Sequence, residues 1–417
     1  MSNLPAGRAQ AIIKKSMETS PEEVRALYRR LRCLLLLLCL ALPGAAAGAE
    51  GAVEEQLARM FEKYSTLGAS VAVFQNGRVT YTYTYGQIRP GGPEVTADTA
   101  FQVGSISKMV ACIGLLQLMD AKDVSLDDEL GDVLGYEVRN PYYPQVPVTL
   151  RQLMTHTASL QDASDYNRAL DGRGLPLKIL FTQEGRAVFL QQRPGARRLY
   201  SNFGGGLIGS LIEALSGRTL DDYMSEKVFE PLGITAAYQA SRLAPDVPVA
   251  DLYYMPRRRL AKRVREEIPT LRDYCFTAGK LTISAPDLCK ILIALCDGGV
   301  CGDARILKES QTQEMLTPQN YTGSVTCESE NGLFINIITD DEVEGRTLYG
   351  HGGKANGMLC AAYFDPSDRT GVVMLTNGCQ NKSMHNGVGM LGRNILTLCY
   401  ELVIGPDHQV ENPFEVR

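Results

Sequence analysis

The sequence lacks several features that mark common protein classes. It has no tryptophan, no internal repeat, and no long basic stretch beyond its first fifty residues, which speaks against a repeat protein and against nucleic-acid binding. Its eleven cysteines form no CxxC pair and no cysteine–histidine spacing suited to zinc. Its longest apolar run, Cys33–Leu42, is too short to span a bilayer comfortably.

What is present is the composition of an ordinary globular protein. Hydrophobic residues make up 45% of the 417 positions, charged residues 21%, and the net charge is −5. This length suits one large domain or two sub-domains. Cys296 and Cys301 flank a DGGV turn and could pair across it, although buried apolar packing is the simpler expectation for most of the cysteines.

The first 49 residues form a segment of their own. Three arginines precede the apolar run, and proline, glycine and small residues follow it, which is the layout of a secretory signal peptide. Cleavage would fit after Ala47 or Ala49. Because the region before the apolar run is unusually long for a signal peptide, a true start further downstream, at Met17, would suit it. An anchor that is never cut is the alternative. We expect a signal or anchor over 1–49, a mature domain over 50–417, and an exported protein that is secreted, periplasmic or at the cell surface.

Strand patterns lie at both ends of the remaining chain. Two strand-like runs flank Asn76-Gly77, a dipeptide typical of a type I′ hairpin turn. Further strand patterns fill 332–378, and a closing helix is expected near 387–400. The fold class predicted is therefore mixed α+β, with one antiparallel sheet assembled from both chain ends and flanked by helices.

Helical patterns dominate the middle, from about residue 104 to 315. Thr149 and Ser284 stand where helix N-caps are expected, and Ala-Pro-Asp follows the latter. We therefore predict a helical sub-domain inserted between the two groups of strands. A dense basic cluster within 255–267 is expected to be a solvated surface helix.

A serine and a lysine stand three residues apart where an apolar helix begins. In a helix, Ser105 and Lys108 would share one face, with Cβ atoms about 5–6 Å apart. Ser105 would lie in the first turn, where free N–H groups favour developing negative charge. The apolar helix would bury Lys108 and favour its neutral form, which can accept the serine proton. Taken alone, however, an S-x-x-K pattern is expected about once by chance in such a chain, so a polar start to a buried helix also explains it.

Two downstream triplets carry further polar groups. The YSN triplet, 200–202, precedes a glycine-rich helix start, where a tyrosine can relay protons and an asparagine can hold a substrate carbonyl. The HGG triplet, 351–353, is expected to form a turn that precedes a strand, and its glycines would let the backbone approach a substrate closely. Taken alone, each triplet is better explained without catalysis, YSN as a helix N-cap with a packed tyrosine and HGG as a loop with a surface histidine.

Together the three stretches resemble the serine β-lactamase and penicillin-binding-protein superfamily. SISK, YSN and HGG follow one another at about 95 and 150 residues, and they match the S-x-x-K, Y-x-N and K/H-T/G-G elements of the branch containing class C β-lactamases, D,D-carboxypeptidases, esterases and D-amino-acid peptidases. VTLRQLMTHTASL, RPGARRLYSN, FTAGKLTISAPDLCKILIALCDGG and GVVMLTNG match that branch as well. The resemblance runs from Val53 to Tyr400 and implies a β-lactamase/transpeptidase-like fold.

The resemblance implies catalytic roles for three residues. Ser105 resembles the nucleophile that forms an acyl-enzyme, and Lys108 resembles its base partner. Tyr200 resembles the group that moves protons to the leaving group and from water. The family uses no cofactor and no metal, so none is expected here.

The resemblance also implies a set of substrate-binding residues. Asn202 resembles the group that positions the substrate amide. His351, Gly352 and Gly353 resemble the strand triplet at the border of the site. The oxyanion hole would consist of the backbone N–H groups of the nucleophile and of Lys354.

Some positions depart from the pattern of true class C β-lactamases. His351 stands where those enzymes have lysine and Gly352 where they have threonine, so the grip on a β-lactam carboxylate should be weaker. Lys280 replaces a glycine and could add a positive contact for an acidic substrate. His156, in the HTASL stretch, is expected to be a structural hydrogen-bonding residue.

Two hypotheses follow. The first is a serine hydrolase that acts through an acyl-enzyme on an amide, ester or lactam, such as a D-amino-acid peptide, a short ester or a β-lactam. The alternative is a catalytically weak penicillin-binding or sensing module of the same fold. Either would take a small molecule or short peptide, conceivably related to the cell wall, with no nucleic-acid partner and with membrane association only through the N-terminal apolar segment.

Overall fold

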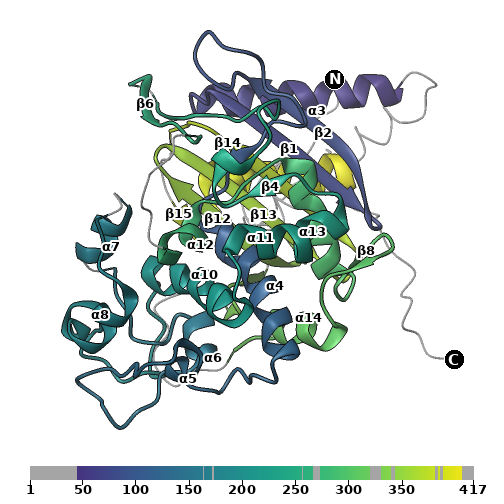
Figure 1. Ribbon diagram of the computed structural model, residues 1–417. Coiled ribbons are helices and arrows are strands. Elements are labelled where there is room, and N and C mark those ends of the chain that lie inside the picture. The colour runs from purple at the N-terminus through teal and green to yellow at the C-terminus, as the bar shows by residue number, and fades with distance from the viewer. Residues whose placement is uncertain are drawn as a thin grey trace, which may run out of the picture. The chain divides into compact units, whose positions relative to one another are not determined.

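The computed structural model describes residues 45–162, 164–170, 173–255, 257–265, 273–319, 330–339, 343–380, 384–385 and 388–405 (Figure 1). The apolar run of the expected signal or anchor lies outside these residues. Helix α3, Ala45–Lys63, runs through the expected boundary at 49/50 and crosses from one compact unit into a second, which begins at Leu57. Everything below concerns the second unit.

A seven-stranded antiparallel sheet forms the centre of this unit, in the order β10-β11-β12-β13-β14-β1-β2. Its strands come from both ends of the chain, as the sequence predicts, because β1 pairs with β14 from Ala69↔Thr376 to Gln75↔Thr370. The strands are β1 (Gly68–Gln75), β2 (Arg78–Gly86), β10 (Glu330–Asn331), β11 (Asn336–Thr339), β12 (Thr347–Ala355), β13 (Met358–Asp365) and β14 (Thr370–Thr376).

The first hairpin has the predicted turn. Asn76 and Gly77 join β1 to β2, and both have positive φ, 50° and 75°, as a type I′ turn requires. Tyr83 and Tyr85 of β2 pack on Phe61 of α3, with ring centroids 6.3 and 5.3 Å apart. The aromatic face of the outer strand is thereby covered.

Helices cover both faces of the sheet. Helix α13 (Ala285–Cys296) packs on β1, β13 and β14 over the face that carries Ala362 and Val373, whose side chains join the large core of the helical region. Helix α15 (Met390–Cys399), followed by a π-helical turn over Tyr400–Ile404, packs on the opposite face against Ala361 and Met374. Alternate side chains of the central strands therefore pack into two hydrophobic cores, one on each face of the sheet.

The helical sub-domain is inserted between β2 and β10, as predicted. Its centre is α4, which packs against α10 and α12 in front of β12 and β13 (Figure 1). The helices are α4 (Ile106–Ala121), α5 (Leu130–Leu134), α6 (Leu150–Met154), α7 (Ser164–Leu170), α8 (Leu177–Thr182), α9 (Gly185–Val188), α10 (Asn202–Ser216), α11 (Leu220–Met224), α12 (Phe276–Gly279) and α14 (Glu309–Leu316). A small sheet of β3 (Phe101–Gln102), β7 (Thr282–Ile283) and β4 (Ala236–Ala237) holds the start of α4.

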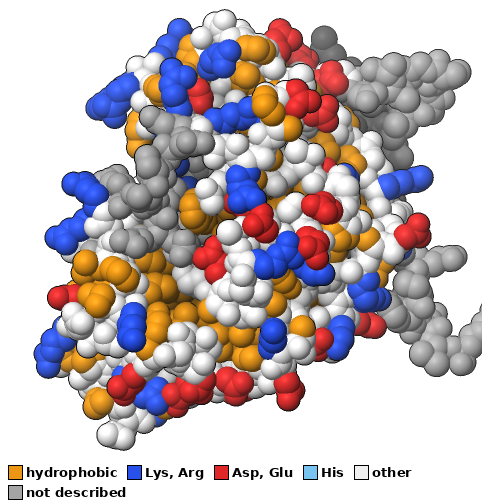
Figure 2. Space-filling view, in the orientation of Figure 1, with side chains coloured by type: hydrophobic (Ala, Val, Ile, Leu, Met, Phe, Trp, Pro, Cys, Tyr) orange, Lys and Arg blue, Asp and Glu red, His pale blue; other side chains and the backbone are white. Residues whose placement is uncertain are grey.

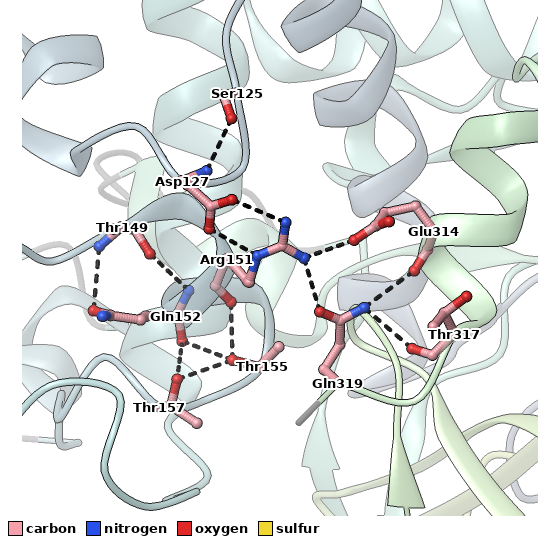
Figure 3. A network of polar contacts seen from close by, with 10 residues as sticks. All are labelled: Ser125, Asp127, Thr149, Arg151, Gln152, Thr155, Thr157, Glu314, Thr317 and Gln319. Carbon is pink, nitrogen blue, oxygen red and sulfur yellow. Dashed lines mark hydrogen bonds and ion pairs between the residues drawn. The ribbon is translucent and has the colours of Figure 1, made fainter. Parts of the chain in front are cut away.

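A network centred on Arg151 fixes the segment that leads from α6 into the site (Figure 3). Its guanidinium binds both carboxylate oxygens of Asp127, at 2.8 and 3.1 Å, and donates to Glu314 of α14 at 2.6 Å. Thr149 and Gln152 close a capping box at the start of α6. The loop from residue 155 onward therefore starts from an anchored helix end.

The basic cluster within 255–267 is not the predicted helix. Its described part forms strand β6 (Arg259–Lys262), which pairs with β5 (Leu252–Tyr254). Main-chain pairing overrides the charge pattern here, and the Arg259 guanidinium lies 5.3 Å from the Tyr254 ring centroid. Arg265 is half-buried and donates to the carbonyls of Ala244, Pro245 and Val247.

The surface agrees with a chain of mixed charge. Basic and acidic side chains are interspersed over most of the face shown in Figure 2. In the part of the chain that the structure describes, no helix has the length and apolar character needed to cross a bilayer. Cys296 and Cys301 are both free thiols, so the pairing left open by the sequence is not formed.

Candidate active site

Ser105 stands at the start of α4, as the sequence predicts. It is the N-cap residue, with φ −63° and ψ −12°, and its side chain makes no capping bond. Its backbone N–H makes no hydrogen bond to any described residue. A half-buried hydroxyl and a free N–H group are thus presented together at a helix N-terminus.

Lys108 lies on the same helix face and is completely buried, with 0% of its surface exposed. Its Nζ lies 3.1 Å from Ser105 Oγ, 3.0 Å from Asn202 Oδ1 and 2.5 Å from the carbonyl oxygen of Ala278. The amide and carbonyl oxygens are acceptors only, so they hold two N–H groups of the lysine. The third hydrogen-bonding direction of Lys108 Nζ points at the Ser105 hydroxyl.

Tyr200 reaches Ser105 from the other side. Its hydroxyl donates to Ser105 Oγ at 2.6 Å, while the residue remains 42% exposed. Lys108 Nζ lies 5.1 Å from the Tyr200 ring centroid, and the His156 ring packs on Tyr200 at 4.3 Å. The structure therefore brings a tyrosine that is 95 residues away in the sequence to the serine–lysine pair.

Asn202 is held by an aspartate that the sequence did not identify. Its Oδ1 accepts from Lys108, and its Nδ2 donates to Asp162 at 2.8 Å. Asp162 also accepts from the Ser201 hydroxyl at 3.0 Å and from the Phe203 N–H at 2.9 Å. One carboxylate thus anchors the first turn of α10. Both ends of the Asn202 amide are used inside the protein, so its expected role toward a substrate amide stays a prediction.

The HGG triplet lies on β12, directly beside the start of α4. A Cβ on Gly353 would lie 2.0 Å from the carbonyl oxygen of Val103, so only glycine fits there. A Cβ on Gly104 would lie 3.0 Å from the backbone nitrogen of Lys354, whose own side chain is exposed. The N–H groups named for an oxyanion hole are therefore neighbours, and β11 pairs only as far as Gly350 of this strand.

His351 is a neutral imidazole at neutral pH. It is 6% exposed, and its Nδ1 lies 2.6 Å from the Gly352 carbonyl, which can only accept, so Nδ1 carries the proton. Burial lowers the pKa of His351 to about 3, and the charges of Lys108 and Arg198 act in the same direction. The triplet therefore offers no positive charge and, with Gly352, no hydroxyl.

His156 has the structural role expected of it. Its Nδ1 accepts from the Ser201 N–H at 3.3 Å, and its ring packs edge-on against Phe334 at 4.9 Å. Burial holds its pKa well below the usual value, with further lowering from Arg198 and Lys108. A neutral His156 supports the back of the Tyr200 ring and fixes the residue after it.

Lys280 lies at the C-cap of α12, one residue after Gly279, which packs against Gly104. It is half-buried, and its expected contact with an acidic substrate stays a prediction. Among the residues that the structure describes, no cluster of three histidine, cysteine, aspartate or glutamate side chains could hold a metal ion.

This sheet, its helical insertion and the serine–lysine pair define a β-lactamase-type protein. A family model described as Beta-lactamase matches residues 50–390. The chain belongs to this family, whose members are serine hydrolases, and the family predicted from the SISK, YSN and HGG stretches is confirmed.

Its curated relatives are distant. A penicillin-binding protein 4 from Amycolatopsis lactamdurans is 27% identical over 337 residues, covering 78% of this chain and 84% of the relative. A D-aminopeptidase from Brucella anthropi is 25% identical over 345 residues, again 78% of this chain. That match spans only 59% of the aminopeptidase, less than two thirds of its length.

Solved structures show the same fold. An octameric penicillin-binding protein homologue from Pyrococcus abyssi superposes with a TM-score of 0.68 at 23% identity, covering 87% of this chain and 79% of the other. A D-amino acid amidase from Ochrobactrum anthropi SV3, complexed with D-phenylalanine, gives 0.66 at 20% identity, with coverages of 85% and 99%. The predicted fold class is confirmed.

Two parts of the site escaped the sequence analysis, and the purpose of a third was not foreseen. Asp162 follows the HTASL stretch directly, and its place after that stretch was the one available signal. The Ala278 carbonyl that holds Lys108 has no side-chain signal at all. The glycine-rich start of α10 was noted in the sequence, but without a reason for it. Its purpose is clear only once Lys108 is seen to pass beside it.

Proposed function

We propose that this protein is a serine hydrolase that forms an acyl-enzyme on Ser105 and acts on an amide, ester or lactam. The observation that carries the proposal is the position of Ser105 Oγ between Lys108 Nζ at 3.1 Å and Tyr200 Oη at 2.6 Å. A nucleophile with a base on one side and a hydroxyl donor on the other is the arrangement that acyl transfer needs.

Acylation would begin with proton transfer from Ser105 Oγ to Lys108 Nζ. The serine oxygen attacks the substrate carbonyl, and the resulting oxyanion is stabilised by the N–H groups of Ser105 and Lys354. Tyr200 then donates its proton to the leaving nitrogen or oxygen as that bond breaks. The lysine proton restores the tyrosine hydroxyl, and the acyl group remains on the serine.

Deacylation would run through the same groups in the opposite sense. A water molecule replaces the leaving group, gives its proton toward Tyr200 and Lys108, and attacks the acyl carbon. Ser105 recovers its proton as the ester bond breaks. The exposure of Tyr200, 42%, leaves this side of the serine open to water.

Substrate class is supported by the relatives and by the strand triplet. The relatives' names include penicillin-binding protein, D-aminopeptidase and D-amino acid amidase, so D-amino-acid peptides, amides and short esters are the first candidates. A neutral His351 and a glycine at 352 provide little hold on a β-lactam carboxylate, so we expect slow lactam hydrolysis.

The test is labelling followed by a substrate panel. A fluorophosphonate probe and a fluorescent penicillin should label the wild type, and Ser105→Ala should abolish the adduct. Nitrocefin, p-nitrophenyl esters, D-Ala-D-Ala peptides and D-amino-acid amides then rank the substrates. Labelling without turnover of any of them would favour the alternative, a penicillin-binding or sensing module. No adduct and no turnover would overturn the proposal.

We also propose export, directed by the segment before residue 50. The pattern of basic, apolar and small residues supports it. Cell fractionation, with mass spectrometry of the N-terminus, separates a cleaved signal from an uncut anchor. Cytosolic protein with an intact N-terminus would contradict it.

A further inference from the structure

Ser107, the second serine of the SISK stretch, has no part in the mechanism proposed above, yet it is completely buried, with 0% of its surface exposed. Its hydroxyl donates to the carbonyl oxygen of Gly104 at 2.6 Å, and its backbone N–H donates to the same oxygen at 2.9 Å. The hydroxyl oxygen in turn accepts from the backbone N–H of Leu281 at 3.0 Å. The side chain of Ser107 is thus both donor and acceptor, and both partners are main-chain groups.

The Gly104 carbonyl belongs to the same peptide unit as the Ser105 N–H. A trans peptide is planar, and its C=O and N–H groups point in opposite directions. The two hydrogen bonds that hold this carbonyl toward the first turn of α4 therefore aim the N–H the other way, out of the helix. That N–H makes no hydrogen bond to any described residue, and it is one of the two that we propose to stabilise the oxyanion.

This peptide unit needs a restraint because it follows a glycine. Gly104 has φ 59°, a left-handed conformation that glycine adopts without steric cost. A larger residue has little room there, because a Cβ would lie 3.0 Å from the Lys354 nitrogen. Glycine also leaves the peptide that follows it more freedom to rotate than other residues do. The hydrogen bonds from Ser107 remove that freedom without a side chain at position 104.

The link through Leu281 extends this restraint to the segment that holds the lysine. Leu281 lies three residues after Ala278, whose carbonyl accepts from Lys108 Nζ at 2.5 Å. The hydrogen bonds run in series, from the Leu281 N–H to the Ser107 hydroxyl and from that hydroxyl to the Gly104 carbonyl. Hydrogen bonds in series polarise one another, so the N–H at the end of this chain becomes a stronger donor.

We infer that Ser107 is a positioning residue of the oxyanion hole, whose hydroxyl orients and polarises the Gly104–Ser105 peptide so that its N–H donates to the oxyanion. This inference rests on the proposed function and adds a residue to the same site. Ser107 acts through the peptide and not by contact with the substrate. Its contribution therefore grows as the carbonyl oxygen of the substrate gains negative charge in the transition state.

The test compares a p-nitrophenyl ester with its thiono analogue, in which sulfur replaces the carbonyl oxygen. Sulfur accepts hydrogen bonds weakly, so the thiono ester gains little from the oxyanion hole. Ser107→Ala should lower kcat/KM for the oxygen ester by about tenfold or more, and for the thiono ester by less than about threefold. Ser107→Thr retains the hydroxyl and should keep kcat/KM for the oxygen ester within about threefold of wild type.

Ser284→Ala is the matched control. The Ser284 hydroxyl is also buried and accepts from a backbone N–H, that of Asp287, but it caps α13. Its loss should lower stability without changing the ratio of the two kcat/KM values. Thermal unfolding is recorded for every variant. If Ser107→Ala does not fold, Ser107→Cys takes its place, because a thiol fills the space but is a weak donor.

The outcomes separate this inference from the proposed function. If the fluorophosphonate probe labels the wild type but Ser107→Ala keeps its activity, or loses it equally toward both esters, Ser107 does not act on the oxyanion hole. A folded Ser107→Thr that is as slow as Ser107→Ala would overturn the inference as well. Absence of both labelling and ester hydrolysis in the wild type would remove the proposed function itself.

Discussion

Gly205 and Lys108 meet where α10 crosses α4, and the lysine occupies the space that a side chain on Gly205 would need. A Cβ on Gly205 would lie 2.2 Å from Lys108 Cε and 2.5 Å from Cδ, well inside van der Waals contact. Gly205→Ala should therefore displace Nζ from Ser105. We expect kcat/KM to fall by about 10²-fold and the free energy of unfolding by about 1–3 kcal/mol.

Gly204→Ala is the matched control for that prediction. A Cβ there would meet its nearest neighbours at 3.6 Å, an ordinary contact. The change should leave activity intact and raise stability by up to about 1 kcal/mol, because alanine favours a helix. Probe acylation rates and urea unfolding measure both effects. Equal behaviour of the two variants would show that the lysine position is not limiting.

Lys108→Ala should lower the acylation rate by about 10²- to 10⁴-fold, because Ser105 would lose the group that accepts its proton. The probe adduct, followed with time, measures this rate. The substitution also leaves the Asn202 amide and the Ala278 carbonyl without their donor, so thermal unfolding must be recorded alongside. Near-normal acylation in a folded variant would show that another base is used.

Tyr200→Phe should act mainly on proton transfer to the leaving group and from water. We expect acylation and deacylation by amide substrates to slow by about 10²-fold, with the acyl-enzyme visible as a mass increase on the intact protein. Because the phenol is partly exposed and the ring contacts are kept, stability should hardly change. Unchanged turnover would remove Tyr200 from the proposed mechanism.

Asp162→Ala should loosen the first turn of α10 and, through it, Asn202. Loss of this acceptor should cost about 1–2 kcal/mol of stability, and kcat/KM should fall by about tenfold or more as Asn202 shifts. Asp287→Ala is the control. Asp287 stands in the first turn of α13, away from the site, and its carboxylate accepts from the Thr235 N–H. A stability loss without any activity loss in Asp162→Ala would refute the positioning role.

His351 should make the fold sensitive to mild acid. Its pKa is about 3 in the folded protein and about 6.5 when unfolded, so the unfolded chain binds the extra proton between these values. Stability contributed by the neutral ring is complete above pH 6.5 and is lost as the pH falls. At pH 5 the loss is about 2 kcal/mol. Urea unfolding of wild type and His351→Gln at pH 5 and 7 measures it, and equal pH slopes would contradict it.

The elements with strong local signals could be predicted from the sequence. Asn76-Gly77 specifies its turn through backbone preference alone, and the apolar body of α4 allowed its helix to be read from periodicity. The SISK, YSN and HGG stretches identified the family, and the structure places them side by side. The basic cluster was misread, because pairing with Leu252–Tyr254 is a non-local interaction that its charges do not reveal.

The support of the site was harder to foresee for the same reason. Asp162 acts through three donors at the start of α10, about forty residues further along the chain. Lys108 is held by a main-chain oxygen, at Ala278, that any residue type would supply. Such contacts depend on tertiary packing between segments far apart in the chain, and no local sequence pattern predicts them.

The pairing of β1 with β14 has a consequence for how the chain is made. Strand β1 leaves the ribosome about three hundred residues before its partner exists. Until then the first hairpin has one long apolar edge uncovered, which invites pairing with other nascent chains. Folding dominated by such distant contacts is slow. We expect a fragment that ends before residue 370 to aggregate, and the complete chain to need protection during synthesis until its last strand arrives.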